Sequence, residues 1–220
     1  QLIVMKRRLN ILCLLVMLVF CYSVFESAYY FSNAFMAGFR VGMNAEHDKE
    51  QLKRTHNMKS ISLFPDDFVD LKDSVYNEKS GKFVPAIYGK LIVSVNTPIN
   101  LWFKFTSMLC NFIGIFTMIF SVVFFFKLIV AINKSNIFSW KNVRRLRWLG
   151  AILILNFICD ALPAYISAYE LSDAFSIPGY SLNLSGLVSK LTLTLGLVAL
   201  IVGEIFAIGL RMKEEQDLTI

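Results

Sequence analysis

Apolar side chains gather in four long stretches of this chain, and most charged side chains lie between or beside these stretches. The stretches cover residues 9–30, 103–126, 148–169 and 187–210. A hydrocarbon core about 30 Å thick is crossed by about 20 residues of helix, in which each backbone amide is hydrogen-bonded within its own segment. The pattern therefore predicts an all-α membrane protein with four transmembrane helices.

The boundaries of the predicted parts follow the same pattern. We expect an N-terminal tail and the first transmembrane helix in residues 1–36, and the other transmembrane helices in residues 103–133, 148–170 and 187–210. Polar segments connect them: an extracytoplasmic cap at 37–102, a basic cytoplasmic loop at 134–147, a short outer loop at 171–186 and a cytoplasmic tail at 211–220.

The cap has the composition of a water-soluble protein, and its pattern predicts a small α+β insertion between the first two transmembrane helices. Residues 90–96 have the β-branched composition of a strand, with residues 61–64 as the candidate partner, and residues 77–82 are turn-like. The segment is too short for a well-packed core of its own. We therefore expect the cap to lean on the outer ends of the transmembrane helices.

After Pro65, the spacing of Phe68, Leu71 and Val75 predicts a short amphipathic helix. Four aspartates fall on its other faces: Asp66, Asp67, Asp70 and Asp73. Their spacing lacks the alternating oxygen ligands and the central glycine of an EF-hand loop. We therefore interpret them as a solvated helix face and not as a calcium site.

Basic side chains beside the apolar stretches predict how the chain crosses the membrane, because short cytoplasmic loops retain positive charge. They precede the first stretch, separate the second from the third, and follow the fourth: Lys6, Arg7, Arg8, Lys127, Lys134, Lys141, Arg144, Arg145, Arg147, Arg211 and Lys213. We expect a multi-pass protein with both termini cytoplasmic. The same residues explain the net charge of +6, so the lipid bilayer is the expected partner and no direct binding of nucleic acid is expected.

The first apolar stretch is longer than the apolar region of a cleaved signal peptide, which spans about 7–15 residues. We therefore expect an uncleaved membrane anchor, although residues 32–34 (SNA) offer a small-residue alternative for cleavage. Residues 5–8 (MKRR) have the pattern of a translation start, so we expect Met5 to be the native first residue.

Composition gives little support to an enzyme. The 4 cysteines all fall within apolar stretches and form no CxxC pattern, and the 2 histidines, His47 and His56, have no metal-ligand spacing. No nucleophile with an adjacent base and no paired carboxylates stand out. We therefore expect no catalytic residues, no metal site and no cofactor.

Polar side chains inside the apolar stretches are candidate sites, because an ionisable group in lipid costs several kcal/mol. They are Asp160, Asn156, Glu204, Glu26 and Asn111. Asn156 and Asp160 continue into Ala164 and Ala168 as a stripe that we expect to face other helices, and Ala199, Gly203 and Ala207 form a matching stripe in the fourth stretch. Two interpretations stay open: Asp160, Asn156 and Glu204 line a path for a proton, ion or ligand, or they serve structural contacts.

Within the structural interpretation, partners can be named for several of these groups. Asp160 would be protonated or bonded to a neighbouring helix, and Glu204 would reach the cytoplasmic boundary and Arg211. Lys190, at the outer end of the fourth stretch, would pair with Glu26 or with the acids of the preceding loop.

Two cytoplasmic motifs carry a resemblance to a known family. Residues 138–150 (FSWKNVRRLRWLG) open the third apolar stretch, and residues 204–220 (EIFAIGLRMKEEQDLTI) close the chain. Both resemble the domain of unknown function 2975 (DUF2975), an uncharacterised family of bacterial four-span membrane proteins. The resemblance implies a bacterial cytoplasmic-membrane location, no established reaction, and frequent neighbourhood with small helix-turn-helix regulators.

The cytoplasmic ends of the predicted helices carry a second set of candidate residues. It comprises Arg144, Arg145, Arg147, Lys213, Glu214, Glu215 and Asp217. Ion pairs between the arginines and the acidic tail would create a docking surface, although exposed pairs are individually weak, and the alternative is that the arginines bind anionic lipid.

We therefore expect a non-enzymatic membrane protein that senses a signal and contacts a cytoplasmic protein, with a helix-turn-helix regulator as the first candidate. The alternative is a small transporter or channel subunit that uses Asp160 and Asn156. That alternative requires a homo-oligomer, because four helices enclose little volume.

Overall fold

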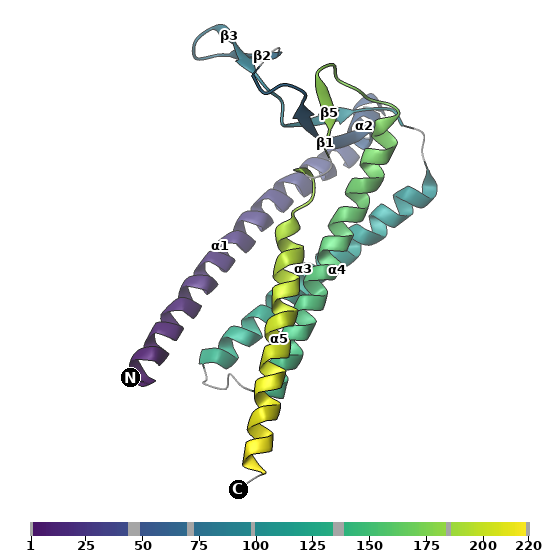
Figure 1. The fold of residues 1–220 in the computed structure, drawn as a ribbon. Helices are drawn as coiled ribbons and strands as arrows, with labels where there is room; N and C mark the ends of the chain where they lie inside the picture. Colours follow the sequence, from purple (N-terminus) through teal and green to yellow (C-terminus); the bar gives the residue numbers. More distant parts are fainter. Residues whose placement is uncertain are drawn as a thin grey trace. The chain divides into compact units, whose positions relative to one another are not determined.

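The computed structural model describes residues 2–43, 49–69, 73–97, 100–133, 139–183 and 186–218. Along the chain the elements are α1 (Leu2–Met43), α2 (Lys49–His56), β1 (Met58–Pro65), β2 (Asp73–Asn77), β3 (Lys82–Ala86), β4 (Lys90–Ser94), α3 (Leu101–Asn133), α4 (Trp140–Ser172), β5 (Tyr180–Leu182) and α5 (Lys190–Asp217) (Figure 1). Two compact units divide the chain. The helical unit comprises residues 1–43, 113–157 and 190–220, and the sheet unit comprises residues 44–112 and 158–189.

The four predicted apolar segments form α1, α3, α4 and α5, and each of these helices is long and apolar enough to cross a membrane. Each helix is longer than its apolar stretch. α3 and α4 have 33 residues apiece, which at 1.5 Å per residue gives about 50 Å, more than a hydrocarbon core requires. The polar residues at the helix ends therefore continue the helix instead of ending it.

The start of α4 shows how a polar segment becomes helical. Residues 140–147, assigned above to a loop, form its first two turns. The backbone N–H of Asn142 donates to the carbonyl oxygen of Ser139 at 2.9 Å and lies 3.4 Å from its hydroxyl. Serine is a favoured N-cap residue, so Ser139 is the sequence signal that marks this boundary. At the other end of the chain, residues 211–217 of the predicted tail belong to α5, since lysine, glutamate and glutamine favour helix.

In the helical unit, α4 and α5 approach closely where both carry glycine. A Cβ atom at Gly150 would lie 2.6 Å from Cγ of Leu200 and 2.7 Å from the carbonyl oxygen of Gly196. The predicted small-residue stripe of α5 lies in this contact: Gly203 and Ala207 are buried and Ala199 is half-buried. α1 contacts α3 through the ring of Phe20, which packs against the rings of Phe125 and Phe126.

The sheet unit contains a three-stranded antiparallel sheet in the order β4-β1-β5. Ile61 pairs with Leu91 of β4 and Leu63 pairs with Leu182 of β5. The predicted pairing of residues 61–64 with residues 90–96 is therefore confirmed. β5 was not predicted, because three residues are too short to show an alternating pattern.

The core of the sheet unit is completed by α4. Leu171, in the last turn of α4, is 0% exposed and forms a buried cluster with Ile61 and Leu63. The expectation that the cap leans on a helix end is confirmed at this residue. A three-stranded sheet alone would leave this apolar face uncovered.

β2 and β3 form a separate antiparallel hairpin, and the amphipathic helix predicted after Pro65 is wrong. Val75 lies in β2 opposite Val84, and the rings of Tyr76 and Phe83 pack 5.4 Å apart across the hairpin. Cross-strand pairs of this kind favour a strand over a helix. The turn predicted at residues 77–82 is confirmed, with Gly81 at a φ of 63°. Asp70 and Leu71, like His47, lie outside the described residues.

One hydrogen bond ties this hairpin to the rest of the sheet unit. The phenol of Tyr180 in β5 donates to Oδ2 of Asp73 at 2.5 Å and accepts from the backbone N–H of Tyr88. The bond to Asp73 raises the pKa of the Tyr180 phenol, since it favours the protonated form. It therefore stabilises the fold at neutral pH and is lost only as the pH rises through the raised pKa in alkaline solution.

Candidate functional site

Asn156 of α4 joins α3 through its side-chain amide. Its Nδ2 donates to Oγ1 of Thr117 at 3.0 Å and to the carbonyl oxygen of Gly114 at 3.3 Å. Thr117 is buried and donates its own hydroxyl to Gly114 at 2.8 Å. Polar side chains between apolar helices are used in this way to hold the helices together. The geometry favours the structural interpretation for Asn156.

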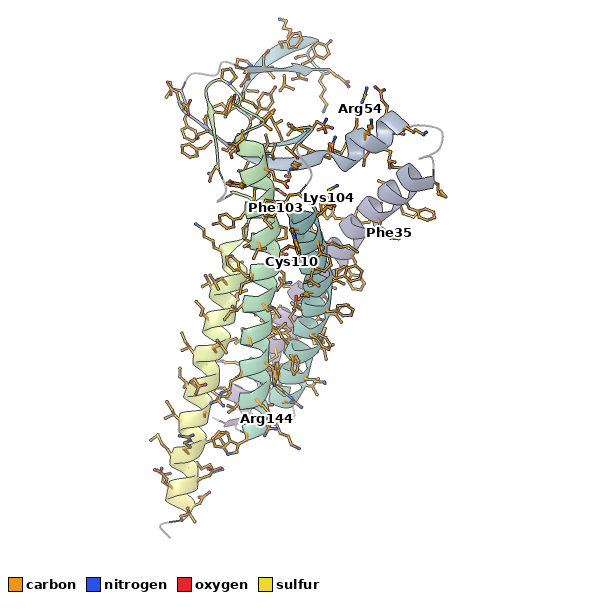
Figure 2. All side chains as sticks on the ribbon, turned by 90° about the vertical axis from the view of Figure 1, so that its right-hand side faces the viewer. Phe35, Arg54, Phe103, Lys104, Cys110 and Arg144 are labelled. Atoms are coloured by element: carbon orange, nitrogen blue, oxygen red, sulfur yellow. The ribbon has the colours of Figure 1, made fainter. Side chains whose placement is uncertain are left out.

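Asp160, one turn further along α4, is exposed in the single chain and makes no hydrogen bond or ion pair with any described residue. The expectation that this face points at other helices is therefore not met within the single chain. The two residues that flank it, Cys159 and Ala161, are buried. Asp160 therefore lies on the side of α4 between these two buried positions. Cys159 lies against Cys110 of α3, which is labelled in Figure 2, and all four cysteines are free thiols.

Glu204 of α5 forms a two-pronged ion pair with Arg147 of α4. Oε1 of Glu204 lies 2.8 Å from Nε of Arg147, and Oε2 lies 2.9 Å from a terminal guanidinium nitrogen. This parallel geometry is the strong form of an arginine–carboxylate contact. Glu204 was expected to reach Arg211, and the charge of Arg211 does act on it. Its ion pair, however, is with Arg147, because the close approach of α4 and α5 at Gly203 places Arg147 within reach. Sequence spacing within one helix cannot reveal such a partner.

The basic residues at the start of α4 were predicted to form ion pairs with the acidic residues of the tail, and the structure shows other partners. Nε1 of Trp140 donates to Glu214 at 2.7 Å, while Arg145 donates to Oδ1 of Asn142 at 3.0 Å and to the carbonyl oxygen of Lys127 at 3.2 Å. α4 and α5 are thus joined near their polar ends by an indole and by the Arg147–Glu204 pair. Arg144 projects from the start of α4 and is exposed (Figure 2). In the last turns of α5, the side chains of Lys213, Glu215 and Asp217 are exposed as well.

The remaining polar candidates are not brought together. Glu26, Asn111 and Lys190 are all exposed. Lys190 makes no ion pair within the described part of the chain, so the pairing with Glu26 or with the loop acids is not found. The carboxylate of Glu170 is instead paired with Lys59 of β1.

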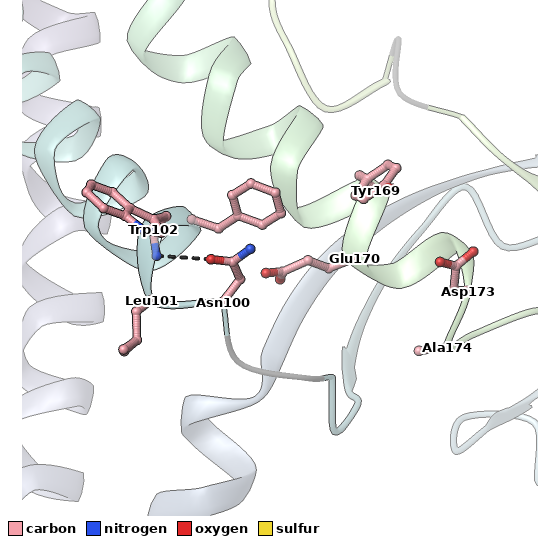
Figure 3. A pocket seen from close by; sticks show the side chains of 8 residues that line it. Asn100, Leu101, Trp102, Tyr169, Glu170, Asp173 and Ala174 are labelled. Carbon is pink, nitrogen blue, oxygen red and sulfur yellow. Dashed lines mark hydrogen bonds between the residues drawn. The ribbon is translucent and has the colours of Figure 1, made fainter.

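A hollow of about 700 Å³ lies at the start of α3 and the end of α4, within the sheet unit (Figure 3). Its lining consists of Asn100, Leu101, Trp102, Phe103, Tyr169, Glu170, Asp173 and Ala174. Asn100 caps α3, since its Oδ1 accepts a hydrogen bond from the backbone N–H of Trp102 at 3.1 Å. The sequence analysis missed this site. The signal was present as aromatic and acidic residues at the ends of two neighbouring apolar stretches.

These features define a class: a mainly helical chain with four helices able to cross a membrane and a small sheet packed on the end of one of them. The chain belongs to the DUF2975 family, whose model, described as "Protein of unknown function (DUF2975)", matches residues 70–220. The resemblance seen in residues 138–150 and 204–220 is thereby confirmed, and the match begins beyond α1, α2 and β1. No curated protein and no solved structure is significantly similar to this chain.

Proposed function

We propose that this chain is a non-enzymatic membrane protein that senses a signal outside the cytoplasm and passes it to a cytoplasmic protein. In this proposal both termini are cytoplasmic, the sheet unit faces outward, and the protein resides in the bacterial cytoplasmic membrane. The basic residues near the start of α4 and the end of α5 support this orientation, because positive charge is retained on the cytoplasmic side.

The continuity of α4 is the observation that carries the proposal. Its last turn places Leu171 in the core of the sheet unit, and its first turns bond to α5 through Trp140 and Arg147. α4, which contains Pro163, thus contributes residues 140–157 to the helical unit and residues 158–172 to the sheet unit. In this proposal, a change of the sheet core at Leu171 alters α4, and the first turns of the same helix carry the polar contacts with α5.

The proposed contact surface for the cytoplasmic partner consists of exposed charges near those polar contacts. Lys141 and Arg144 supply positive charge, and Glu215 and Asp217 supply negative charge. A surface of mixed charge favours specific recognition over general adhesion to anionic lipid. The resemblance described above makes a helix-turn-helix regulator the first partner to test.

The test is affinity purification of the full chain from native membranes after crosslinking. We expect one cytoplasmic protein to copurify with the wild-type chain, and we expect it to be lost when residues 213–220 are deleted. The substitution Arg144→Glu, which leaves α5 complete, should weaken recovery of the same protein because it reverses an exposed charge of the proposed surface.

The matched control is Lys190→Glu, which reverses an exposed charge at the start of α5 and should leave recovery unchanged. Recovery of the partner at the wild-type level with both the deletion of residues 213–220 and Arg144→Glu would contradict the proposed contact surface. Failure to recover any cytoplasmic protein, together with solute flux into proteoliposomes that requires Asp160, would support the alternative function instead.

That alternative, a transporter or channel subunit, is favoured by one observation. Asp160 is a carboxyl side chain in the middle of an apolar helix, and it is exposed in the single chain. An ionisable side chain that faces lipid is costly and rare, so this position favours contact with a second copy or with another membrane protein. Asn156 no longer supports the alternative, because its amide is already bonded to α3.

A further inference from the structure

The hollow at the start of α3 and the end of α4 has the size and the walls of a small-molecule site. Its volume of about 700 Å³ falls within the range of about 300–1,000 Å³ that such sites occupy. Three aromatic side chains contribute to its wall: Trp102, Phe103 and Tyr169. In the view of Figure 3, Trp102 and Tyr169 lie on opposite sides of the carboxylate of Glu170.

The charges around the hollow leave one carboxylate without compensation. Glu170 is paired with Lys59, whose ammonium group also donates to Thr97 at 3.0 Å. The two paired side chains are only 14% and 18% exposed, so Lys59 holds Glu170 in place in the wall and compensates its charge. Asp173 is exposed and has no hydrogen bond or ion pair among the residues that the structure describes. The hollow therefore carries a net negative charge.

Two of the three aromatic side chains of the wall are largely exposed, and Phe103 is half-exposed. Trp102 is 78% exposed and Tyr169 is 68% exposed. Tryptophan and tyrosine are common at the level of lipid headgroups. That location alone does not explain the carboxylate beside the rings, because a carboxylate repels an anionic headgroup. Aromatic faces combined with a carboxylate are suited to a cation that carries apolar substituents.

We propose that this hollow binds an organic cation with a quaternary ammonium group. The ammonium group would lie against the ring of Tyr169 through a cation–π contact, and Asp173, on the same side of the hollow in Figure 3, would supply the counter-charge. A metal ion is a poor fit, because a hard cation requires several oxygen ligands and only one carboxylate here is uncompensated. The ligand has two sources with the same chemistry: a free quaternary amine, or the choline headgroup of a lipid. The role of this ligand as the signal of a sensor rests on the function proposed above.

The test measures binding to the purified full chain in nanodiscs by isothermal titration calorimetry. The probe is choline, and its comparison compound is 3,3-dimethylbutan-1-ol, which has the same shape without the charge. We expect choline to bind in nanodiscs of phosphatidylglycerol and the neutral alcohol not to bind. Loss of choline binding in nanodiscs that contain phosphatidylcholine would identify the lipid headgroup as the source, and retained binding would identify the free amine.

Two variants of the wall and two matched controls connect binding to these residues. Tyr169→Leu and Asp173→Asn should each weaken choline binding by about fivefold or more, the loss expected for one cation–π or charge contact. Tyr165→Leu, at an exposed tyrosine one turn earlier on α4, and Asp66→Asn should leave the affinity unchanged. All four positions are exposed, so the variants should fold, and thermal unfolding of each verifies this.

Equal affinity for choline and for the neutral alcohol would overturn the inference. So would an absence of choline binding in every nanodisc, or affinities that the two wall variants leave unchanged. Copurification of a cytoplasmic partner together with failure to bind choline would overturn this inference alone. Choline binding without copurification of a cytoplasmic partner would support this binding site and contradict the proposed sensor function.

Discussion

Substitution of Leu171 by alanine is expected to lower the free energy of unfolding of the sheet unit by about 2–5 kcal/mol, the usual cost of removing a buried leucine side chain. Leu171 is fully buried against Ile61 and Leu63, which belong to the central strand of the sheet. Its loss would leave a cavity between β1 and the last turn of α4. Thermal and chemical unfolding of the purified chain in detergent measures the effect.

The matched control for this prediction is Leu162→Ala. Leu162 lies on the same helix but is exposed, so removal of its side chain creates no cavity. We expect its unfolding to be close to that of the wild-type chain. Similar losses for the two variants would mean that Leu171 does not form the core that joins α4 to the sheet.

The second large effect is expected from Gly150→Ala in the helical unit. The added Cβ would lie 2.6 Å from Cγ of Leu200 and 2.7 Å from the backbone carbonyl oxygen of Gly196, and backbone cannot move aside cheaply. Overpacking of this kind typically costs about 1–3 kcal/mol. The separation of α4 from α5 would also weaken the Arg147–Glu204 pair. We therefore expect a lower melting temperature in detergent.

Gly209→Ala is the control for Gly150→Ala, because it makes the same substitution in α5. A Cβ at Gly209 would meet no atom within 4 Å, and alanine favours helix over glycine by about 1 kcal/mol. We expect this variant to melt at the wild-type temperature or above it. A melting temperature for Gly150→Ala that equals that of Gly209→Ala would show that the two helices are not in close contact there.

The long helices could be predicted from the sequence because their signal is carried by many residues. Each segment has about 20 predominantly apolar positions, so no single polar residue cancels the pattern. The helix boundaries were less accurate, since Ser139, a single capping residue, decides whether residues 140–147 are loop or helix. The strand at residues 90–94 was also recognisable, because its centre is a short apolar run that includes the β-branched residues Ile92 and Val93.

The incorrect predictions share a physical cause, which is that tertiary contacts decided the outcome. Phe68, Leu71 and Val75 have helical spacing, yet Val75 pairs across a hairpin with Val84. β5 exists only because β1 offers it an edge. Neither partner is visible from the local pattern.

The sequence identified the candidate site residues but not the residues to which they are bonded. A carboxyl or amide group in an apolar stretch is easily recognised, so Asn156, Asp160 and Glu204 were identified. Their contacts depend on the approach of helices far apart in sequence, and Arg147 lies 57 positions from Glu204. The hollow beside Tyr169 was missed for the same reason, because its two walls come from different helices.

The most direct measurement is the labelling of single cysteines with a membrane-impermeant maleimide in intact cells. The four native cysteines are first replaced by alanine, and one cysteine is introduced either as Ser80→Cys in the exposed turn between β2 and β3 or as Lys213→Cys in α5. With four helices across the membrane and both ends inside, Ser80→Cys should label in intact cells, whereas Lys213→Cys should label only after permeabilisation. Labelling of Lys213→Cys in intact cells, or recovery of the chain in the soluble fraction without detergent, would contradict this arrangement.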